Sequence, residues 1–170
     1  FLATRNGQAI RFSEQRVRSM GRTAAGVKGV ELVGDDAVVT MEVVAGTPTI
    51  LTVTENGFGK RTRIDEYPLQ NRGGKGVITI KTTERNGSVV GALVVDDDHE
   101  VMLISEKGNI VRTKVGGINV IGRNTQGVTL IDLAADERLV APVYPVEGPE
   151  RDHRSLPGGI DGERPPHDLR

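Results

Sequence analysis

Apolar and polar residues alternate along much of the chain, which is the pattern of β-strands that bury one face. In residues 37–44, every second position from Val39 to Val43 is apolar. The same period of two recurs over residues 51–54 and 78–81. We therefore expect half-buried strands over these segments.

A repeat of about fifty residues organises these strands. A turn glycine recurs at spacings of 50 and 51 residues, at Gly7, Gly57 and Gly108. One arginine stands four residues after each glycine, and a second, which opens the pattern Arg-x-x-x-Gly, stands fifteen residues after it. The first set is Arg11, Arg61 and Arg112, and the second set is Arg22, Arg72 and Arg123. Because this register holds along the chain, we interpret it as three copies of one structural unit.

Each repeat is expected to contain four strands and almost no helix. In the first repeat, the strands are predicted at residues 1–5, 8–12, 27–32 and 37–44. The Asn-Gly pairs at 6–7 and 56–57 favour tight hairpins, because glycine readily adopts a positive φ angle. Ser13 begins a segment that suits one short capped turn, whereas Pro68 excludes a long helix from the matching part of the second repeat. Four strands every fifty residues indicate an all-β fold of propeller-like blades.

These signals divide the chain into a repeat region and a tail. We place the three repeats at residues 1–49, 50–100 and 101–146. From residue 147 to residue 170, proline and glycine supply eight of 24 residues, and no apolar periodicity survives. We therefore predict a disordered tail over residues 147–170. The chain opens at Phe1 within a predicted strand, so we interpret it as a fragment.

Composition excludes several classes of protein. The chain has no cysteine, which rules out disulfide bonds and cysteine-ligated metals. Aromatic residues make up only 3% of it, which disfavours stacking platforms for single-stranded nucleic acid. No segment approaches the ~20 apolar residues of a membrane span, and no secretory leader opens the sequence. We expect a cytoplasmic protein that has no membrane contact, no metal site and no cofactor of its own.

Charge is sorted within the repeats although the net charge is only −1. Segments 5–28, 57–81 and 108–129 together hold 15 basic and three acidic residues, whereas the rest of residues 1–146 holds three basic and 14 acidic ones. If the repeats surround an axis, equivalent positions line one rim and form a continuous basic stripe. Such a stripe suits the phosphate backbone of duplex DNA.

The candidate phosphate-binding residues are the basic side chains of these segments, because arginine offers paired donors to phosphate. They are Arg11, Arg16, Arg18, Arg22, Arg61, Arg63, Arg72, Lys75, Arg112, Lys114 and Arg123. An alternative interpretation is that the recurring arginines are solvated strand faces. Gly26, Gly76 and Gly127 suit a close backbone approach to phosphate, and equally a left-handed turn before the next strand.

Catalytic chemistry has weaker signals. The acidic run from Asp96 to Glu100 invites a metal site, but adjacent residues at a strand junction point in diverging directions and favour a solvated turn. Tyr67 and Tyr144 stand beside prolines, so we expect them to be packing residues. No constellation of residues indicates an enzyme within this chain.

One segment resembles a known family. Gln70-Asn71-Arg72-Gly73-Gly74-Lys75-Gly76 is similar to the glycine-rich box of the C-terminal domain of the DNA gyrase A subunit, a type IIA topoisomerase, with Asn71 in place of the first arginine of the box. Residues 54–62, 83–87 and 121–128 also look like later blades of that domain. The similarity runs from residue 1 to about residue 146.

The resemblance implies a fold and a function. The family domain is a six-bladed β-pinwheel with strand exchange between blades, and this chain looks like its last three blades. The domain bends duplex DNA around its basic rim and so supports ATP-dependent negative supercoiling by the gyrase holoenzyme. The implied partners are duplex DNA, the rest of the gyrase A subunit, and the gyrase B subunit in a heterotetramer.

The resemblance also assigns catalysis to other parts of that enzyme. ATP and Mg²⁺ are used elsewhere in the holoenzyme, and no catalytic residue is expected in this chain. Two alternatives remain open: the related C-terminal domain of topoisomerase IV, and a propeller-like scaffold for an acidic protein partner. Salt dependence separates DNA from the acidic partner, because counterion release makes duplex affinity fall steeply as salt rises.

Overall fold

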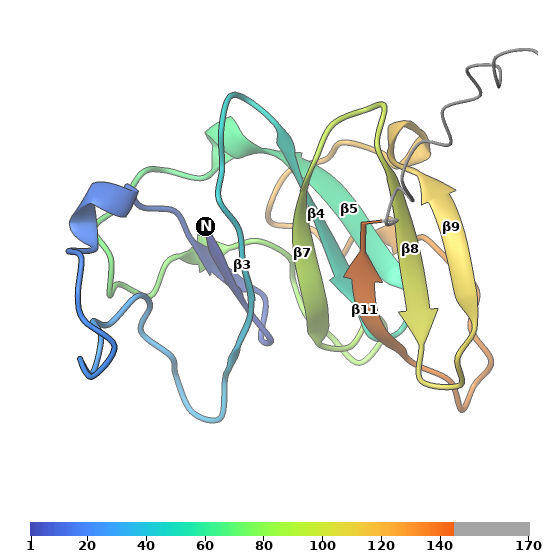
Figure 1. Ribbon diagram of the computed structural model, residues 1–170. Helices are drawn as coiled ribbons and strands as arrows, with labels where there is room; N and C mark the ends of the chain where they lie inside the picture. Colours follow the sequence, from blue (N-terminus) through green and yellow to red (C-terminus); the bar gives the residue numbers. More distant parts are fainter. Residues whose placement is uncertain (145–170) are drawn as a thin grey trace, which may run out of the picture.

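The computed structural model describes residues 1–144, and in it three small antiparallel sheets stand side by side like propeller blades (Figure 1). The all-β fold predicted from the sequence is confirmed. The predicted tail at residues 147–170 lies outside the described residues. None of the helices in the described part of the chain is long and apolar enough to cross a membrane.

Strand order is the same in the first two blades. Blade 1 contains β1 (Leu2–Thr4), β2 (Gln8–Ile10), β3 (Val38–Met41) and β6 (Val77–Ile78), in the order β3-β1-β2-β6. Blade 2 contains β4 (Thr49–Thr54), β5 (Phe58–Arg63), β7 (Val89–Val95) and β10 (Val128–Thr129), in the order β7-β4-β5-β10. Blade 3 contains β8 (Glu100–Ser105), β9 (Ile110–Lys114) and β11 (Leu139–Val143), in the order β11-β8-β9.

The outer strand of a blade comes from the following repeat. Val77–Ile78 of the second repeat pairs with β2, and Val128–Thr129 of the third repeat pairs with β5. The prediction of a strand at residues 27–32 was wrong, because that segment has no regular structure. Its equivalents form strands only by pairing with a preceding blade, and this chain contains no blade before the first.

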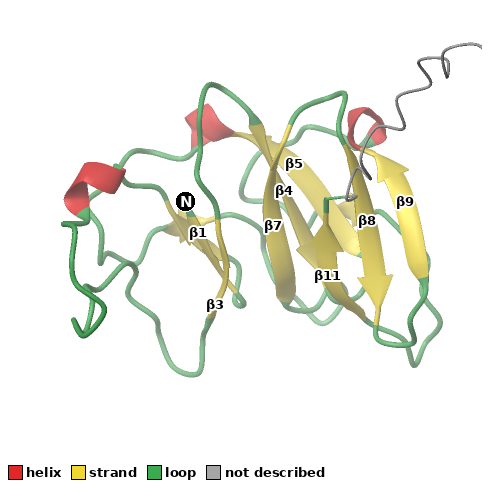
Figure 2. Ribbon diagram, viewed as in Figure 1, coloured by secondary structure: helices red, strands yellow, loops and turns green. Residues whose placement is uncertain are grey.

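Short 3₁₀ turns and tight hairpins join the strands. The turns are η1 (Glu14–Arg16), η2 (Ile64–Glu66) and η3 (Val115–Gly117), and they lie along one end of the blades (Figure 2). The Ser13 hydroxyl caps η1 by accepting from the Gln15 backbone N–H at 3.3 Å, which confirms the predicted capped turn.

The hairpin glycines confirm the repeat register. Gly7, Gly57 and Gly108 have φ angles of 82°, 83° and 83°. In the described residues no side-chain-bearing residue has a positive φ, so the asparagine before each of the first two glycines keeps ordinary geometry. Each loop is thus a three-residue hairpin that closes on a left-handed glycine.

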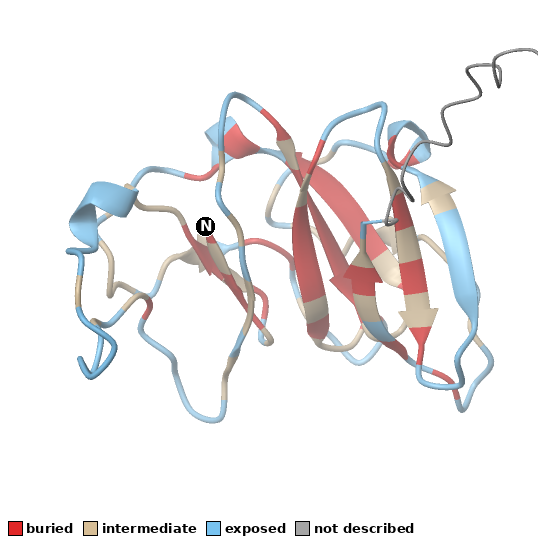
Figure 3. Ribbon diagram, in the orientation of Figure 1, coloured by how far each residue is buried: buried red, intermediate tan, exposed pale blue. Residues whose placement is uncertain are grey.

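The hydrophobic core lies between blades. One cluster joins blades 2 and 3 through residues that include Leu51, Val53, Leu103 and Leu139, and another joins blades 1 and 2 around Phe1 and Tyr67. The central blade is therefore buried on both faces (Figure 3).

This sandwiching corrects the expectation of half-buried strands. Thr52 and Thr54 of β4 are as buried as Leu51 and Val53. The Thr52 hydroxyl lies 3.3 Å from that of Thr79, which lies 2.6 Å from the Tyr67 hydroxyl. A buried hydroxyl requires such partners, so Thr52 joins a hydroxyl network between the blades instead of facing water. The Thr54 hydroxyl donates to the Phe58 carbonyl at 3.2 Å within blade 2.

A buried lysine also fastens one blade to the next. Lys60 on β5 is fully buried, and its ammonium group donates to the backbone oxygens of Gly122 and Arg123 and to the Thr125 hydroxyl. Burial lowers the pKa of Lys60 to about 8. The Lys60 ammonium group thus binds the loop at 122–125 of the third repeat to the second blade.

Substitution of the turn glycines tests the packing between blades. A Cβ at Gly57 would lie 2.4 Å from the carbonyl oxygen of Ile131, whereas a Cβ at Gly108 meets nothing within 4 Å. Both substitutions strain a left-handed residue, so we expect Gly108→Ala to cost about 1 kcal/mol of unfolding free energy. Gly57→Ala should cost at least about 2 kcal/mol more, because the turn at Gly57 and the backbone of Ile131 must also move apart. Urea unfolding followed by far-UV circular dichroism checks this, and equal losses would contradict the packing.

The Lys60 environment predicts a pH dependence. The Lys60 Cε resonance can be assigned by NMR because it is missing from the spectrum of Lys60→Met. Its chemical shift should titrate with pH with a midpoint near 8. Between that value and the ordinary lysine pKa, the unfolded chain binds more protons than the folded chain, so the free energy of unfolding should rise with pH relative to Lys60→Met. A midpoint at the ordinary lysine value would show that the ammonium group is solvated.

Candidate nucleic-acid interface

The strand order gathers the basic segments on one side of the blades. The edge strands β3, β7 and β11 converge, because β7 packs against both of the others. The opposite edges are formed by β6, β10 and β9. Segments 5–28, 57–81 and 108–129 supply the strands of this outer side together with the 3₁₀ turns. The basic halves of the repeats therefore supply the outer side. The convergent edge strands contain no acidic residue, and the acidic side chains of Asp97 and Glu100 lie beside Arg61 and Arg112.

Seven of the candidate residues are exposed on this outer side. They are Arg16, Arg18, Arg22, Arg63, Lys75, Arg112 and Lys114. Two of them have acidic partners: Arg63 pairs with Asp65 at 2.5 Å, and Arg112 pairs with Glu100. The side chains of the other five make no hydrogen bond or ion pair within residues 1–144. Exposed cations without a protein partner are available to bind phosphate.

Two of the arginines that follow the turn glycine face the next blade instead. The Arg11 guanidinium donates to the carbonyl oxygens of Ile64 at 3.1 Å and Tyr67 at 3.3 Å, which belong to η2 and its C-terminal residue. Arg61 is only 5% exposed and donates through Nε to the Ile118 carbonyl at 2.8 Å. Tyr67 and Ile118 occupy equivalent positions of the repeat, so the same arginine contact recurs between blades 1 and 2 and between blades 2 and 3. Arg61 also pairs with Asp97.

The second arginine set makes the reciprocal contact. Arg72 donates to the carbonyl oxygens of Arg16 at 2.9 Å and Lys28 at 3.0 Å. Arg123 donates to the carbonyl of Ile78 at 2.9 Å, which is equivalent to Lys28, and stands over the Tyr67 ring at 5.9 Å. Each arginine of this pair therefore binds the backbone of the preceding repeat.

The box-like loop at residues 70–76 is fastened to blade 1 through its backbone. The Gln70 N–H donates to the Arg11 carbonyl at 2.8 Å, and the Gly73 N–H donates to the Gly29 carbonyl at 2.7 Å. A Cβ at Gly76, where φ is 77°, would lie 2.2 Å from the Ala9 carbonyl oxygen. Gly76 thus permits close contact between two backbones, and Asn71 and Lys75 are the exposed side chains of this loop.

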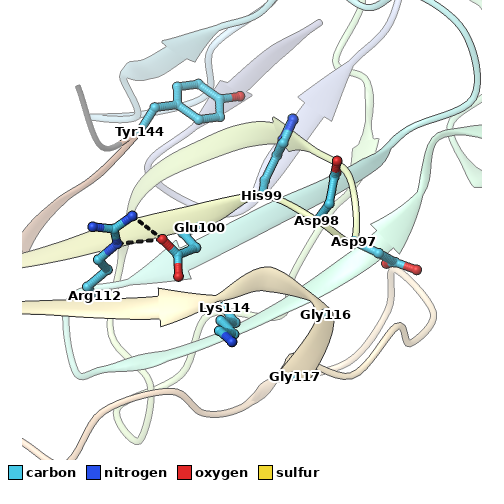
Figure 4. Close-up of a pocket in the computed structure, with 9 residues that line it drawn as sticks. All are labelled: Asp97, Asp98, His99, Glu100, Arg112, Lys114, Gly116, Gly117 and Tyr144. Carbon is cyan, nitrogen blue, oxygen red and sulfur yellow. Dashed lines mark hydrogen bonds and ion pairs between the residues drawn. The ribbon is translucent and has the colours of Figure 1, made fainter. Parts of the chain in front are cut away.

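A pocket of about 760 Å³ lies at the outer end of blade 3 (Figure 4). It is lined by Asp97, Asp98, His99, Glu100, Arg112, Lys114, Gly116, Gly117 and Tyr144. His99 accepts the Asp96 backbone N–H at 3.2 Å, so the acidic run forms a turn. Within residues 1–144, no group of three His, Cys, Asp or Glu side chains is placed to hold a metal ion.

Two exposed lysines of the basic segments were not among the candidates. Lys28 stands at the position equivalent to Ile78 of β6, Lys81 stands three residues after β6, and both are exposed. Lys28 lies 4.0 Å from Glu31. Their positions are not basic in every repeat, so recurrence gave no signal for them. Exposure inside a basic segment identifies them once the strand order is known.

The chain is similar to proteins of one family along its described length. It matches the family model described as "DNA gyrase C-terminal domain, beta-propeller" over residues 1–45, 48–96 and 99–143. The DNA gyrase A subunit of Salmonella typhimurium (strain LT2) is 58% identical over 134 residues, which are 79% of this chain and 15% of that protein. The chain therefore spans a small part of the length of the relatives it matches.

Two solved structures share the fold. The structure of a DNA gyrase A C-terminal domain matches with a TM-score of 0.78 and 31% identity, covering 83% of this chain and 48% of that one. The crystal structure of the C-terminal domain of a DNA topoisomerase IV matches with a TM-score of 0.79 and 30% identity, covering 84% and 45%.

The two environments of equivalent arginines predict different effects on stability. Arg61→Ala should lower the free energy of unfolding by about 3 kcal/mol, because it leaves a buried carbonyl without its charged donor. Arg112→Ala should change it by no more than about 0.5 kcal/mol, because the side chain is exposed and its ion pair is solvated. Chemical denaturation of both variants provides the comparison. Equal effects would show that Arg61 is not a junction residue.

Proposed function

The chain belongs to the DNA gyrase C-terminal domain, beta-propeller family, and from this premise we propose that it binds duplex DNA without sequence preference and wraps it along the outer side of its blades. The observation that carries the proposal is the concentration of exposed cations on the outer side. The segments that supply this side, 5–28, 57–81 and 108–129, hold 15 basic and only three acidic residues.

The proposed contacts are made to phosphate by the exposed basic residues of the outer side. Arg16, Arg18, Arg22, Lys75 and Lys114 are exposed without a protein partner in the described part of the chain. Arg63 and Arg112 add to the positive potential once DNA competes for their carboxylate partners. Ammonium and guanidinium groups on phosphate carry no base information, which accounts for the absence of sequence preference.

The buried and half-buried arginines are assigned a supporting role. Arg11, Arg61, Arg72 and Arg123 hold adjacent blades together through backbone carbonyl oxygens. They set the angle between blades and thereby the path that the exposed cations offer to DNA. Bending duplex over a site of this size costs on the order of a few kcal/mol, so the contacts must be distributed over several blades.

The activity of the whole protein extends the proposal. We infer that this chain serves the DNA gyrase A subunit, and that wrapping presents a DNA segment for ATP-dependent negative supercoiling by a holoenzyme that also contains the gyrase B subunit. The proposed setting is a cytoplasmic heterotetramer in which other domains bind ATP and Mg²⁺ and cleave DNA. This chain is proposed to set the path of the bound DNA, whereas other domains cleave it.

Two other assignments are less well supported. A topoisomerase IV domain has nearly the same TM-score as the gyrase domain, 0.79 against 0.78. Gyrase is favoured because the family model and the Salmonella relative, at 58% identity, are both gyrase. An acidic protein partner would bind the same exposed cations, and the salt dependence of binding separates it from DNA.

The assignment of phosphate contacts predicts the salt dependence of DNA binding. The triple variant Arg16→Ala, Arg18→Ala, Lys75→Ala should bind a labelled duplex more weakly. It should also reduce the slope of log K against log salt by up to ~3, at ~0.9 per lost phosphate contact. Fluorescence anisotropy at several salt concentrations measures the slope.

A matched control removes three charges from elsewhere. Arg85, Lys107 and Arg138 are the basic residues of 1–146 outside the basic segments, and all three are exposed. Their triple alanine variant should leave the slope nearly unchanged. An equal fall in both variants would mean that net charge and not the outer side governs binding. An unchanged slope in the first variant would favour the acidic partner.

A further inference from the structure

Three Asn-Gly pairs stand in turns of this chain, at residues 6–7, 56–57 and 86–87. An asparagine before glycine is chemically labile, because glycine has no Cβ to shield its backbone nitrogen from the side-chain amide that precedes it. The three glycines have similar positive φ angles of 82°, 83° and 73°. Sequence and turn conformation therefore leave the pairs alike, and the groups that hold each asparagine side chain make the difference.

Asn86 is the most tightly held of the three. Its side chain is buried, and its Oδ1 atom accepts from the Thr83 backbone N–H at 2.8 Å and from the Thr83 hydroxyl at 3.1 Å. Its Nδ2 atom donates to the carbonyl oxygens of Lys81 at 2.8 Å and Gln126 at 2.9 Å. Rotation of this amide toward the next backbone nitrogen would break all four hydrogen bonds.

Asn56 is half-buried and is held by three hydrogen bonds. Its Nδ2 atom donates to the carbonyl oxygens of Glu84 at 3.2 Å and Arg85 at 3.1 Å. Its Oδ1 atom accepts from the Arg138 guanidinium group at 2.6 Å. The last bond is charge-assisted and is therefore the strongest of the three.

Asn6 is exposed, and within residues 1–144 its side chain makes no hydrogen bond. Its backbone is fixed, because its N–H donates to Asp36 Oδ1 at 2.9 Å and its carbonyl accepts from the Thr82 hydroxyl at 3.3 Å. The Gly7 N–H donates to the Thr4 carbonyl at 3.1 Å, the same length as the equivalent bond at residue 57. Asn6 and Asn56 therefore differ in their side-chain partners and not in the hairpin itself.

The repeats that surround Asn6 explain its lack of a partner. Arg138, which binds the Asn56 amide, directly precedes the inner strand β11 of the following repeat. The residue that directly precedes β7, in the repeat that follows Asn6, is Ser88. A serine has one short hydroxyl where arginine has a long guanidinium group. Asn6 therefore lacks the donor that holds Asn56, although the equivalent segment is present beside its blade.

We propose that Asn6 is a site of spontaneous covalent modification, in which water replaces its amide and leaves aspartate or isoaspartate. The Gly7 nitrogen gives its proton to a solvent base and bonds to Asn6 Cγ. The Cγ–Nδ2 bond breaks, and the nitrogen takes up a proton and leaves as ammonia. One water then opens the resulting succinimide ring, giving aspartate by cleavage at Cγ and isoaspartate by cleavage at the backbone carbonyl. The reaction consumes one water, releases one ammonia and needs no oxidant or reductant.

The modification acts on the contact between blades 1 and 2. The Gly7 carbonyl accepts from the Thr79 N–H at 2.9 Å and so holds the following repeat against the hairpin. Isoaspartate adds one methylene to the backbone before Gly7, which changes the length of a loop that fits a left-handed glycine. Aspartate keeps the backbone and adds only a carboxylate near Asp36. The isoaspartate product therefore loosens this contact more than the aspartate product does.

Peptide mapping of the aged chain tests the proposal without DNA, so the result does not depend on the proposed function. The full chain is kept in mildly alkaline buffer, with and without guanidinium chloride, and samples are digested with trypsin. Cleavage after lysine and arginine places the three pairs in separate peptides, 6–11, 29–60 and 86–107. Replacement of the amide by a carboxyl group raises the mass of a peptide by about 1 Da.

The expected order of rates follows from the hydrogen bonds. In denaturant the three asparagines should react within about threefold of one another, because each precedes glycine and none is held. In buffer, Asn6 should react at least about tenfold faster than Asn56, because no side-chain hydrogen bond has to break, and Asn86 should be the slowest. A rate at Asn6 no higher than that at Asn56 in buffer would overturn the proposal.

Arg138→Ala tests the cause of the order. It removes the charge-assisted bond to the Asn56 amide, so Asn56 should react at least about threefold faster while Asn6 keeps its rate. Lys107→Ala is the matched control, because Lys107 is an exposed cation that pairs with Asp136, and it should change neither rate. An unchanged rate at Asn56 in Arg138→Ala would show that hydrogen bonding does not set the order and would also overturn the proposal.

The effect on the blades is measured on the separated products. Chain that carries isoaspartate at residue 6 should unfold at a lower urea concentration than fresh chain. Asn6→Asp adds the charge without the methylene and should shift the midpoint less. Equal midpoints for fresh chain and the isoaspartate form would contradict the loosening of the contact between blades 1 and 2.

Discussion

The fold depends on one constraint: blades 1 and 2 are each completed by a strand and an arginine from the next repeat. The exchanged strands β6 and β10 are only two residues long, so ladder hydrogen bonds alone hold little. The reciprocal arginine contacts, the buried Lys60 ammonium and the close approach of glycine backbones supply the rest of the junction. Because every tie crosses from one repeat to another, stability belongs to pairs of blades and not to single ones.

The same exchange determines which surface is available for binding. It places the basic half of each repeat on the outer side. Four of the six arginines at recurring positions bind backbone across blades, namely Arg11, Arg61, Arg72 and Arg123. Arg22, Arg112 and basic residues at less regular positions, such as Arg18 and Lys75, are exposed. Architecture and the proposed DNA contacts therefore use different members of one basic set.

Recurrence of an arginine does not by itself distinguish these two uses. A guanidinium group donates equally well to phosphate oxygens and to backbone carbonyl oxygens. Equivalent sequence positions also differ in exposure within the described residues: Arg61 is 5% exposed and Arg112 is 64% exposed. The repeat register predicts that such residues share an environment, but exposure depends on the segments that pack against each of them.

From the sequence alone, the period of two, the turn glycines and the fifty-residue register determined an all-β fold of three similar units, because these signals are local in the chain. The family resemblance at residues 70–76 and its flanks also identified the class of domain. The resemblance implied strand exchange, but only the tertiary structure decided which segments are exchanged, that β4 is buried on both faces, and that Arg11 and Arg61 bind protein. Those features depend on contacts across about fifty residues of sequence, where no local pattern records which strand edge a segment will meet.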